Sequence, residues 1–490
     1  MKKYTGFIYA ASALFLLQSC ATNPVTGRRE VALVSEGQEL NMGKEADPQI
    51  IAQYGLYPDK GLQDFISQKG KEMVAVSHRP NIAYEFKIVD SDVLNAFAIP
   101  GYVYFTRGIM AHFNNEAEFA GVLGHEIGHI TARHSVSQQS KALLGQIGLI
   151  GAMVVRPELA QFGETASQGL GLLFLKFGRD AERQSDQLGV EYSTKIGYDA
   201  SEMAGFFSTL ERKSEESGAQ ELPNFLSTHP NPGERNATVA KLAVEWKKKQ
   251  NLTNPQVNRN AYLKRIEGLV YGEDPKQGFL ENNVFYHPEL KFQFSTPANW
   301  NYQNTPQQVQ FAPKDGKALM FMTLAQGSSL QEAASATLQK YKLVPLESRE
   351  TSVNGLPAIA VVADQQQQQQ QQGQQQQQQQ GAGVRTLSYF IQYGGVVYHL
   401  IGVSSQAEFN MYSQTFTNTM QSFRQLTDAA KLNRQPDRVR IKTLTQDGTL
   451  EQALRRYNVP DSRIEEMAIL NGMRRTDKVE KGTSIKVVER

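Results

Sequence analysis

The chain has 490 residues, 40% of them hydrophobic and 20% charged, which suffices for several globular units. Its 51 basic and 49 acidic side chains leave a formal net charge of +2, so no nucleic acid partner is expected. With Cys20 as its one cysteine, the chain can build neither an internal disulfide nor a zinc site from thiolates.

Residues 1–19 have the pattern of a signal peptide. Two lysines precede an apolar run at 7–17, which is too short to span a bilayer as a mature helix. The run ends in Leu17-Gln18-Ser19-Cys20, which resembles a bacterial lipobox with an unusual Gln18. We expect a lipid on Cys20 to anchor the mature protein; the alternative is a plain secretory signal with an incidental cysteine. Ala21 stands where an inner-membrane retention signal favours Asp, so we expect the outer membrane, facing the periplasm.

Residues 20–265 are predicted to form one domain, mainly helical with a small sheet. Capping residues and apolar spacing indicate helices, and alternation of apolar and polar residues indicates strands. The stretch 142–175 is apolar and rich in glycine, which fits either buried helices or a lid over a cleft. The predicted helices cover 35–53, 115–133, 180–196, 199–215 and 233–249, and the extended segments lie near 84–88, 94–98 and 102–105.

The rest of the chain has a different pattern of apolar and polar residues. Residues 283–428 show short alternating strands and two helices, at 329–342 and 406–423, which indicates a separate α+β domain. The glutamine run at 365–380 is predicted to be a loop between two strands. Residues 438–490 are expected to form a compact module in the order strand, helix, helix, strand.

The sequence His125-Glu126-Ile127-Gly128-His129 lies within the predicted helix 115–133. Residues four apart share one face of a helix, so the two histidine rings can bind one zinc ion. Glu126 is then placed to take a proton from the attacking water and later deliver it to the leaving amine. A chance match on a surface helix is the bland alternative, but Leu123, Ile127 and Ile130 predict a buried helix, where unpaired charge is costly.

A catalytic zinc site needs a third protein ligand and an open position. Glu182 and Asp186 lie one turn apart on the helix predicted to begin near residue 180. Glu182 is the candidate ligand, and Asp186 would orient a ligand histidine. Taken alone, two carboxylates at this spacing usually mark a solvated helix face. Beside the histidine pair they complete a site for one zinc ion per chain.

Two further histidines need separate treatment. His134 is five residues beyond His129, so an unbroken helix would place it off the metal-binding face. His229 lies in the proline-containing loop Ser227-Thr228-His229-Pro230-Asn231-Pro232, which could fold back over the site. We expect it either to take the fourth zinc position and block the enzyme, or to cap the next helix or stabilise the oxyanion.

Together the motifs resemble those of the BepA-like periplasmic branch of the HtpX and CAAX-prenyl-protease family. The likeness covers about residues 23–250. It implies a gluzincin-type fold in which zinc is held by His125, His129 and Glu182, with Glu126 as base, and a role in envelope protein quality control. The sequence departs from the family in having one glycine, Gly101, where the family has two. The motifs are Asn23-Pro24-Val25-Thr26-Gly27, Asn95-Ala96-Phe97-Ala98, the two-histidine helix and Arg179-Asp180-x-Glu182-x-x-x-Asp186.

Substrate is expected to bind beside the metal helix. The extended segment 102–105 could be an edge strand that pairs with a substrate backbone, which suits unfolded clients because few side chains are recognised. Asn95, Tyr102 and Tyr104 are therefore the candidate substrate-binding residues.

The C-terminal regions carry weaker resemblances. Residues 283–428 are similar to a PsbP-type domain through Phe294-Ser295-Thr296-Pro297-Ala298-Asn299-Trp300. Residues 438–490 are similar to a LysM module, which implies binding to a glycan such as peptidoglycan; a structural cap is the alternative. The leading hypothesis is a lipid-anchored zinc endopeptidase acting on misfolded or unassembled envelope proteins. The competing hypothesis is a glycan-binding or scaffolding lipoprotein whose peptidase domain mainly holds clients.

Overall fold

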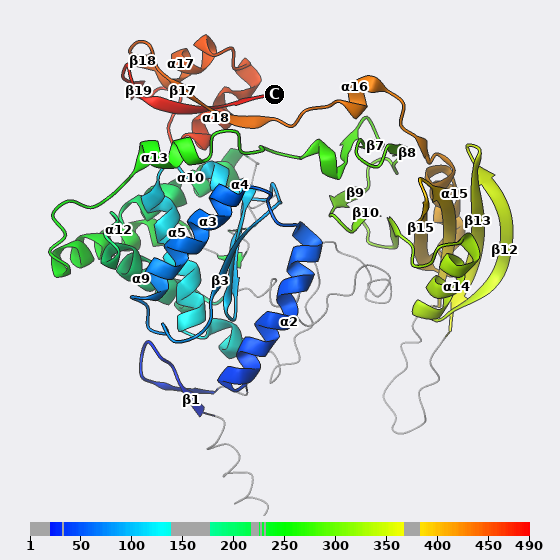
Figure 1. The fold of residues 1–490 in the computed structure, drawn as a ribbon, viewed down its shortest axis with the longest axis horizontal. Coiled ribbons are helices and arrows are strands. Elements are labelled where there is room, and N and C mark those ends of the chain that lie inside the picture. Colours follow the sequence, from blue (N-terminus) through cyan, green and yellow to red (C-terminus); the bar gives the residue numbers. More distant parts are fainter. Residues whose placement is uncertain are drawn as a thin grey trace, which may run out of the picture. The chain divides into compact units, whose positions relative to one another are not determined.

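The computed structural model describes residues 20–31, 34–138, 177–216, 225, 228–229, 232–366 and 383–490. The predicted signal peptide, the stretch 142–175 and the glutamine run beyond residue 366 lie outside these residues. The described residues form two compact units, and Asp437–Arg490 belongs to the first unit while Glu273–Pro436 belongs to the second. Both units contain helices and sheets, which confirms the predicted α+β class (Figure 1).

A three-stranded sheet in the order β3-β5-β4 stands beside the helices of the first unit. The central strand β5 (Tyr102–Thr106) runs parallel to β3 (Glu85–Val89) and antiparallel to β4 (Ala96–Ile99). Alternate residues of a strand point to opposite faces. Val103 and Phe105 accordingly join the main core, whereas Tyr104 packs on the other face in a smaller cluster with Ile50 of α2 (Glu36–Tyr54).

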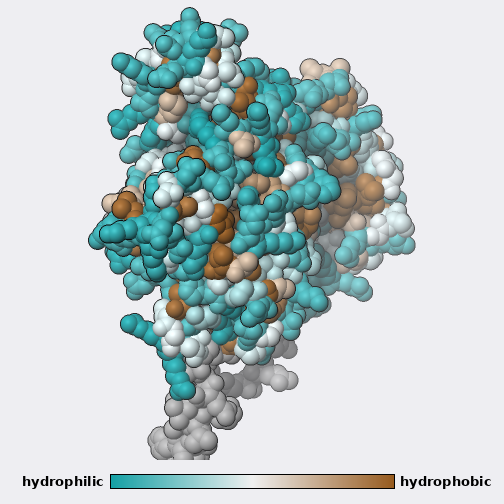
Figure 2. All heavy atoms as spheres, turned by 60° about the vertical axis from the view of Figure 1, so that its left-hand side comes forward, coloured by the Kyte–Doolittle hydropathy of each residue, from teal (hydrophilic) through white to brown (hydrophobic). Residues whose placement is uncertain are grey.

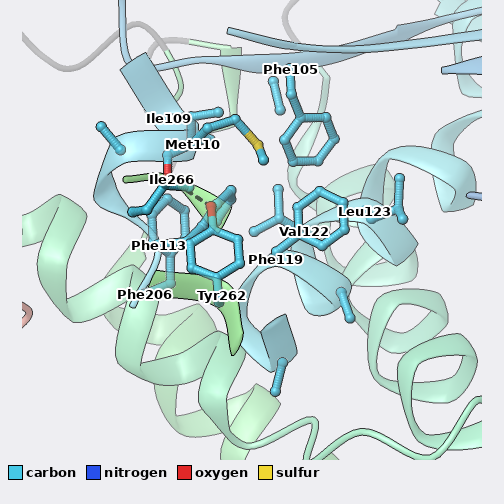
Figure 3. Packing of buried hydrophobic residues seen from close by; sticks show 14 of the residues in the cluster. Phe105, Ile109, Met110, Phe113, Phe119, Val122, Leu123, Phe206, Tyr262 and Ile266 are labelled. Carbon is cyan, nitrogen blue, oxygen red and sulfur yellow. Dashed lines mark hydrogen bonds between the residues drawn. The ribbon is translucent and has the colours of Figure 1, made fainter. Parts of the chain in front are cut away.

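The helices of the first unit bury their apolar sides in one core, part of which is drawn in Figure 3. Aromatic rings of α5, α10 and the segment after α4 meet there, as between Phe113 and Phe206, whose centroids are 4.5 Å apart. Tyr262 of α13 donates its hydroxyl to the carbonyl of Met110 over 2.7 Å. Besides α2, the helices are α3 (Lys60–Val74), α4 (Arg107–His112), α5 (Glu116–Thr131), α9 (Arg179–Lys195), α10 (Glu202–Glu216), α12 (Pro232–Lys249) and α13 (Arg259–Arg265).

The C-terminal segment Asp437–Arg490 shares this core. Its apolar residues, such as Leu454 and Leu470, fall in the same cluster as the metal-helix residues. Backbone hydrogen bonds add to the contact: the Gly268 N–H donates to the Val439 carbonyl, and the Val439 N–H donates to the Leu269 carbonyl, each over 2.8 Å. The elements are β17 (Arg438–Thr443), β18 (Gly448–Thr449), α17 (Leu450–Arg456), η3 (Asp461–Arg463), α18 (Ile464–Leu470), β19 (Lys478–Val479) and β20 (Ser484–Glu489), which is the predicted order of strand, two helices and strand with three short additions.

The second unit is built on a seven-stranded antiparallel sheet in the order β12-β13-β14-β15-β11-β10-β9. Helices α14 and α15 contribute to two separate apolar clusters, one on each face of this sheet. A four-stranded sheet, β16-β8-β7-β6, completes the unit. Its elements are η2 (Pro275–Gln277), β6 (Phe279–Glu281), β7 (Val284–His287), β8 (Phe292–Ser295), β9 (Asn301–Asn304), β10 (Gln308–Ala312), β11 (Ala318–Leu324), α14 (Leu330–Lys340), β12 (Leu343–Val353), β13 (Leu356–Gln365), β14 (Val384–Tyr393), β15 (Val396–Ser405), α15 (Phe409–Gln421), β16 (Arg424–Gln425) and α16 (Ala429–Leu432).

The described chain begins with a small hairpin at the predicted anchor. Strand β1 (Cys20–Thr22) pairs antiparallel with β2 (Arg29–Val31). No helix among the described residues combines the length and the apolar character needed to cross a bilayer. The face drawn in Figure 2 is mostly hydrophilic, with hydrophobic side chains in small groups.

Candidate metal centre

Helix α5 begins at a well-defined cap. Asn115 accepts a hydrogen bond from the Glu118 backbone N–H over 2.8 Å, as the sequence predicts. Helix α9 crosses α5 closely because glycines face each other: a methyl group on Gly124 would lie 3.0 Å from the Cα of Gly189. This approach brings the first turns of α9 beside the two histidines.

Four potential ligands converge between these helices. The Nε2 atoms of His125 and His129 lie 3.0 Å apart, and Glu182 oxygens lie 3.6 Å and 3.5 Å from them. His229 Nδ1 lies 3.1 Å from both His125 Nε2 and a Glu182 oxygen. One ligand atom from each residue lies within 4.8 Å of the other three, and all four residues are buried. Two imidazole nitrogens and a carboxylate are the ligands that catalytic zinc prefers, so these residues fit one zinc ion.

The partner of His125 fixes which nitrogen faces the metal. Its Nδ1–H donates to Asp186 Oδ1 over 2.9 Å, which leaves Nε2 bare for zinc. Arg235 donates two hydrogen bonds to the same carboxylate, over 2.8 and 2.7 Å. Burial would raise the pKa of Asp186, but the charge of Arg235 and the hydrogen bonds outweigh it and hold that pKa below its ordinary value. The carboxylate therefore stays ionised.

Arg235 also supports Glu182, at 3.1 Å, and the His229 carbonyl, at 3.2 Å. Burial acts to raise the pKa of Glu182, yet the neighbouring His229 and the charge of Arg235 hold that pKa below its ordinary value. Arg235 was not among the residues predicted from the sequence. A signal was present, because Arg235 shares a buried stripe with Val239 and Ala243, each four residues apart on α12, and a charge on such a stripe indicates a buried partner.

Glu126 lies beside the ligands without joining them. The side chain is fully buried, and neither oxygen has a hydrogen-bond partner among the described residues. Burial raises the pKa of this carboxyl, partly offset by the nearby positive charge of His229. His229 Nε2 lies 3.6 Å from Glu126 Oε1. A buried carboxylate that makes no hydrogen bond next to a metal site is positioned to exchange a proton with a reacting group.

His229 is held over the site from two directions. Its backbone N–H donates to the Phe225 carbonyl over 2.8 Å, and the Phe225 N–H donates to the Leu94 carbonyl over 3.1 Å. The Phe225 and His229 rings stack at 4.5 Å. The loop therefore does fold back over the metal centre, next to the start of β4.

The prediction that segment 102–105 is an edge strand is wrong. Strand β5 is paired on both sides and offers no free edge, while β4 has no strand on its outer side within the described chain. Tyr104 is fully buried and donates its hydroxyl to Asp47 of α2 over 2.7 Å. Tyr102 stacks against Tyr104 on that same face. Strand alternation thus turns both tyrosines away from the metal helix. Asn95 directly follows Leu94, whose carbonyl accepts from Phe225, and the ring of Phe225 stacks on His229.

The helix pair, its three buried ligands and the adjacent Glu126 define a zinc metallopeptidase. Residues 62–243 match the sequence profile of Peptidase family M48. Zinc as cofactor and the metallopeptidase class, both predicted from the sequence, are confirmed.

Two proteases are similar to this chain in sequence. The beta-barrel assembly-enhancing protease of Yersinia pestis is 29% identical over 267 residues, which are 51% of this chain and 52% of that protein. The mitochondrial metalloendopeptidase OMA1 of Arabidopsis thaliana is 29% identical over 219 residues, 44% of this chain and 42% of that protein. The chain spans about half the length of the curated relatives it matches.

Among solved structures, the cyanobacterial PsbP of Synechocystis sp. PCC 6803 aligns with 29% of this chain and 91% of its own. The TM-score is 0.22 at 8% identity. A PsbP-type fold for residues 283–428 therefore stays a prediction, as does the LysM-like nature of 438–490.

Proposed function

We propose that this protein is a zinc endopeptidase that hydrolyses misfolded or unassembled proteins of the cell envelope. The observation that carries the proposal is the buried cluster of His125, His129 and Glu182, with the carboxylate of Glu126 beside it and free of hydrogen bonds within the described residues. The similarity to the beta-barrel assembly-enhancing protease of Yersinia pestis supports envelope proteins as substrates.

Each residue of the site then has a role in peptide hydrolysis. Zinc, when bound, polarises the scissile carbonyl and makes water more acidic. Glu126 accepts the proton of the attacking water on its carboxylate and passes it to the leaving amine nitrogen. Asp186 keeps the proton of His125 on Nδ1, and Arg235 keeps Asp186 ionised. The buried setting strengthens these interactions, because little water screens them.

His229 is proposed to gate the site. Its Nδ1 lies as close to the other ligand atoms as they lie to one another, so the imidazole can take the fourth metal position. In that case His229→Ala raises proteolysis while zinc stays bound. If His229 instead stabilises the oxyanion, the same change lowers activity by roughly 10²-fold or more. Rates of peptide cleavage by the zinc-loaded variant decide between the two.

Substrate is proposed to pair with the outer edge of β4, the strand that follows Asn95. The support is that the Leu94 carbonyl, two residues before β4, accepts a hydrogen bond from the backbone N–H of Phe225, as it would from a pairing strand. Asn95 Oδ1 is buried without a partner among the described residues, so a backbone N–H of the substrate would satisfy it. Asn95→Ala should raise KM more than it lowers kcat; an unchanged KM would argue for docking elsewhere.

The anchor is proposed to be a lipid on Cys20, holding the enzyme at the outer membrane on the periplasmic side. The support is that the one cysteine of the chain stands at the end of a lipobox-like sequence. Cys20→Ser should then give an unprocessed or released protein, detected by membrane fractionation and intact mass. Unchanged mass and fractionation would count against lipidation. Binding of peptidoglycan by residues 438–490 stays a prediction.

The clients can be identified with an inactive variant. Full-length Glu126→Gln should retain bound substrates long enough for recovery and identification by mass spectrometry, and envelope proteins should be enriched over a His125→Ala control. A scaffolding protein would instead hold the same clients in both variants and show no proteolysis that depends on Glu126.

A further inference from the structure

We propose that His134 is a positioning residue of the metal centre, which accepts a hydrogen bond from His129 and so keeps the metal-facing nitrogen of that ligand free of a proton. The inference rests on the proposed zinc site. It gives His129 a partner that corresponds to Asp186 beside His125, although the two partners differ in charge.

The chain reaches this position by breaking the helix. Helix α5 ends at Thr131, and Arg133 adopts a left-handed conformation with φ of 58° before a new helical turn begins at His134. This conformation is unfavourable for a residue with a side chain. It is stabilised because the Arg133 guanidinium donates to Glu39 over 2.8 Å and to the Val34 carbonyl over 3.1 Å. An unbroken helix would have carried His134 away from the metal-binding face.

The resulting contact is short and buried. His134 Nδ1 lies 3.0 Å from His129 Nδ1, and His134 Nε2 lies 2.9 Å from Oε1 of Gln184 on α9. Ser185 Oγ approaches His134 Nδ1 at 3.3 Å. On its other side, the His129 ring stacks on Phe177 with centroids 4.0 Å apart. The ligand ring is thus confined in orientation as well as bonded.

Only one distribution of protons suits a metal ligand. If Gln184 Oε1 accepts the proton of His134 Nε2, then His134 Nδ1 is bare and accepts from His129 Nδ1–H, which leaves His129 Nε2 free. If the Gln184 amide were turned to donate instead, His134 would donate to His129 and the proton of His129 would sit on Nε2, where it excludes zinc. Zinc binding therefore selects the first arrangement.

The comparison with His125 shows why a neutral partner suffices. His125 bonds to Asp186, a carboxylate that needs Arg235 to balance its charge. His129 bonds to the uncharged ring of His134, which in turn bonds to the uncharged amide of Gln184. No further buried charge is therefore needed near Glu182. The essential property of His134 is consequently an acceptor atom at the place of Nδ1.

A pair of variants of the full-length protein tests this directly. His134→Asn keeps an acceptor near the position of Nδ1, whereas His134→Leu has similar size and none. We expect the zinc dissociation constant, measured by chelator competition, to rise about 10–100-fold for His134→Leu and by no more than a few-fold for His134→Asn. In ¹⁵N-histidine spectra, the proton of His129 should stay on Nδ1 in the zinc-loaded His134→Asn variant.

The outcomes separate the role from simple packing. Zinc affinity at the wild-type level in His134→Leu, or an equal loss in both variants, would overturn the proposal. If His134→Leu does not fold, Gln184→Leu replaces it, with an expected loss of up to about 10-fold; an unchanged affinity there would also overturn it. These readouts measure metal binding alone, so they stand even if Glu126→Gln were to show that the proposed peptidase function is wrong.

Discussion

The two ends of the metal helix α5 are supported by opposite ends of the chain. Before its N-terminus, Lys486 of β20 is fully buried and donates to the carbonyls of Ala111 and Phe113 over 2.8 and 3.0 Å. At its C-terminus, Arg79 donates to the Ile130 carbonyl over 2.9 Å, and Asn23 donates to the Ala132 carbonyl over 3.4 Å.

The two supports use different chemistry. The C-terminal end of α5 is held by a network in which the buried carboxylate of Glu39 accepts from both Arg79 and Arg133. Cations also interact favourably with the end of the helix dipole there. At the other end, beside the Asn115 cap, the buried ammonium of Lys486 donates to two backbone carbonyls and forms no such paired-charge network with them. We therefore expect the ends to respond differently to the loss of one side chain.

The largest effect is expected at the charged end. Arg79→Met would leave Glu39 with less compensation in a buried site, and breaking such a pair costs about 3–5 kcal/mol of unfolding free energy. Denaturant unfolding measures this loss, with Arg28→Met as the control because Arg28 is exposed. A loss below that of the control would show that the network does not support the helix end.

Lys486→Met should cost somewhat less. Two buried carbonyls lose their donor, at roughly 1–3 kcal/mol each, but the desolvated ammonium is removed as well, and burial lowers the pKa of Lys486 well below its ordinary value. Lys481→Met on the same segment is the control, since Lys481 is exposed. Equal stability of the two variants would mean that the C-terminal segment does not secure the helix through Lys486.

Acid should weaken the lysine-supported end through His112, the last residue of α4. Burial lowers the pKa of His112 to about 3, against an ordinary value of 6.5. Because the folded-state pKa is depressed, the unfolded chain binds more protons between these values, and stability falls as the pH drops below 6.5. The slope is about 1.4 kcal/mol per pH unit, or about 2 kcal/mol by pH 5. In His112→Leu, unfolding free energies measured over this range should fall with a slope smaller by about one proton; an unchanged slope would contradict the assignment.

The smallest effect is expected for Asn23. Asn23→Ala removes one long hydrogen bond to Ala132 and the bonds of its own turn, where Asn23 Oδ1 accepts from Val25 over 2.9 Å. A loss of about 1 kcal/mol is expected, as for other small caps. Thermal unfolding checks this value, and a loss as large as that of Arg79→Met would reverse the proposed ranking within this end.

Local rules were enough to predict much of the metal centre. The pair His125 and His129 follows from helical spacing, as does the placing of Asp186 one turn beyond Glu182. The cap at Asn115 was predictable for the same reason, because its partner Glu118 is three residues away. These features depend on contacts within one or two helices.

What sequence spacing could not supply were contacts made across the fold. Strand β5 is central because it also pairs with β3. A local sequence pattern does not specify the order of strands in a sheet. His134 reaches His129 because the helix stops early, and that stop depends on Glu39, far back in the chain. The buried environment of Lys486 likewise arises from packing against α4, so its burial could not be predicted from its sequence neighbours in β20.

The most direct test of the account is proteolysis by full-length Glu126→Gln with the zinc content determined on the same sample. We predict about one zinc per chain, as in the wild type, and cleavage of an unfolded protein that is slower by about 10²–10⁴-fold, because the attacking water has lost its proton acceptor. Near-normal cleavage at full zinc occupancy would contradict the role assigned to Glu126 and with it the mechanism built on this site.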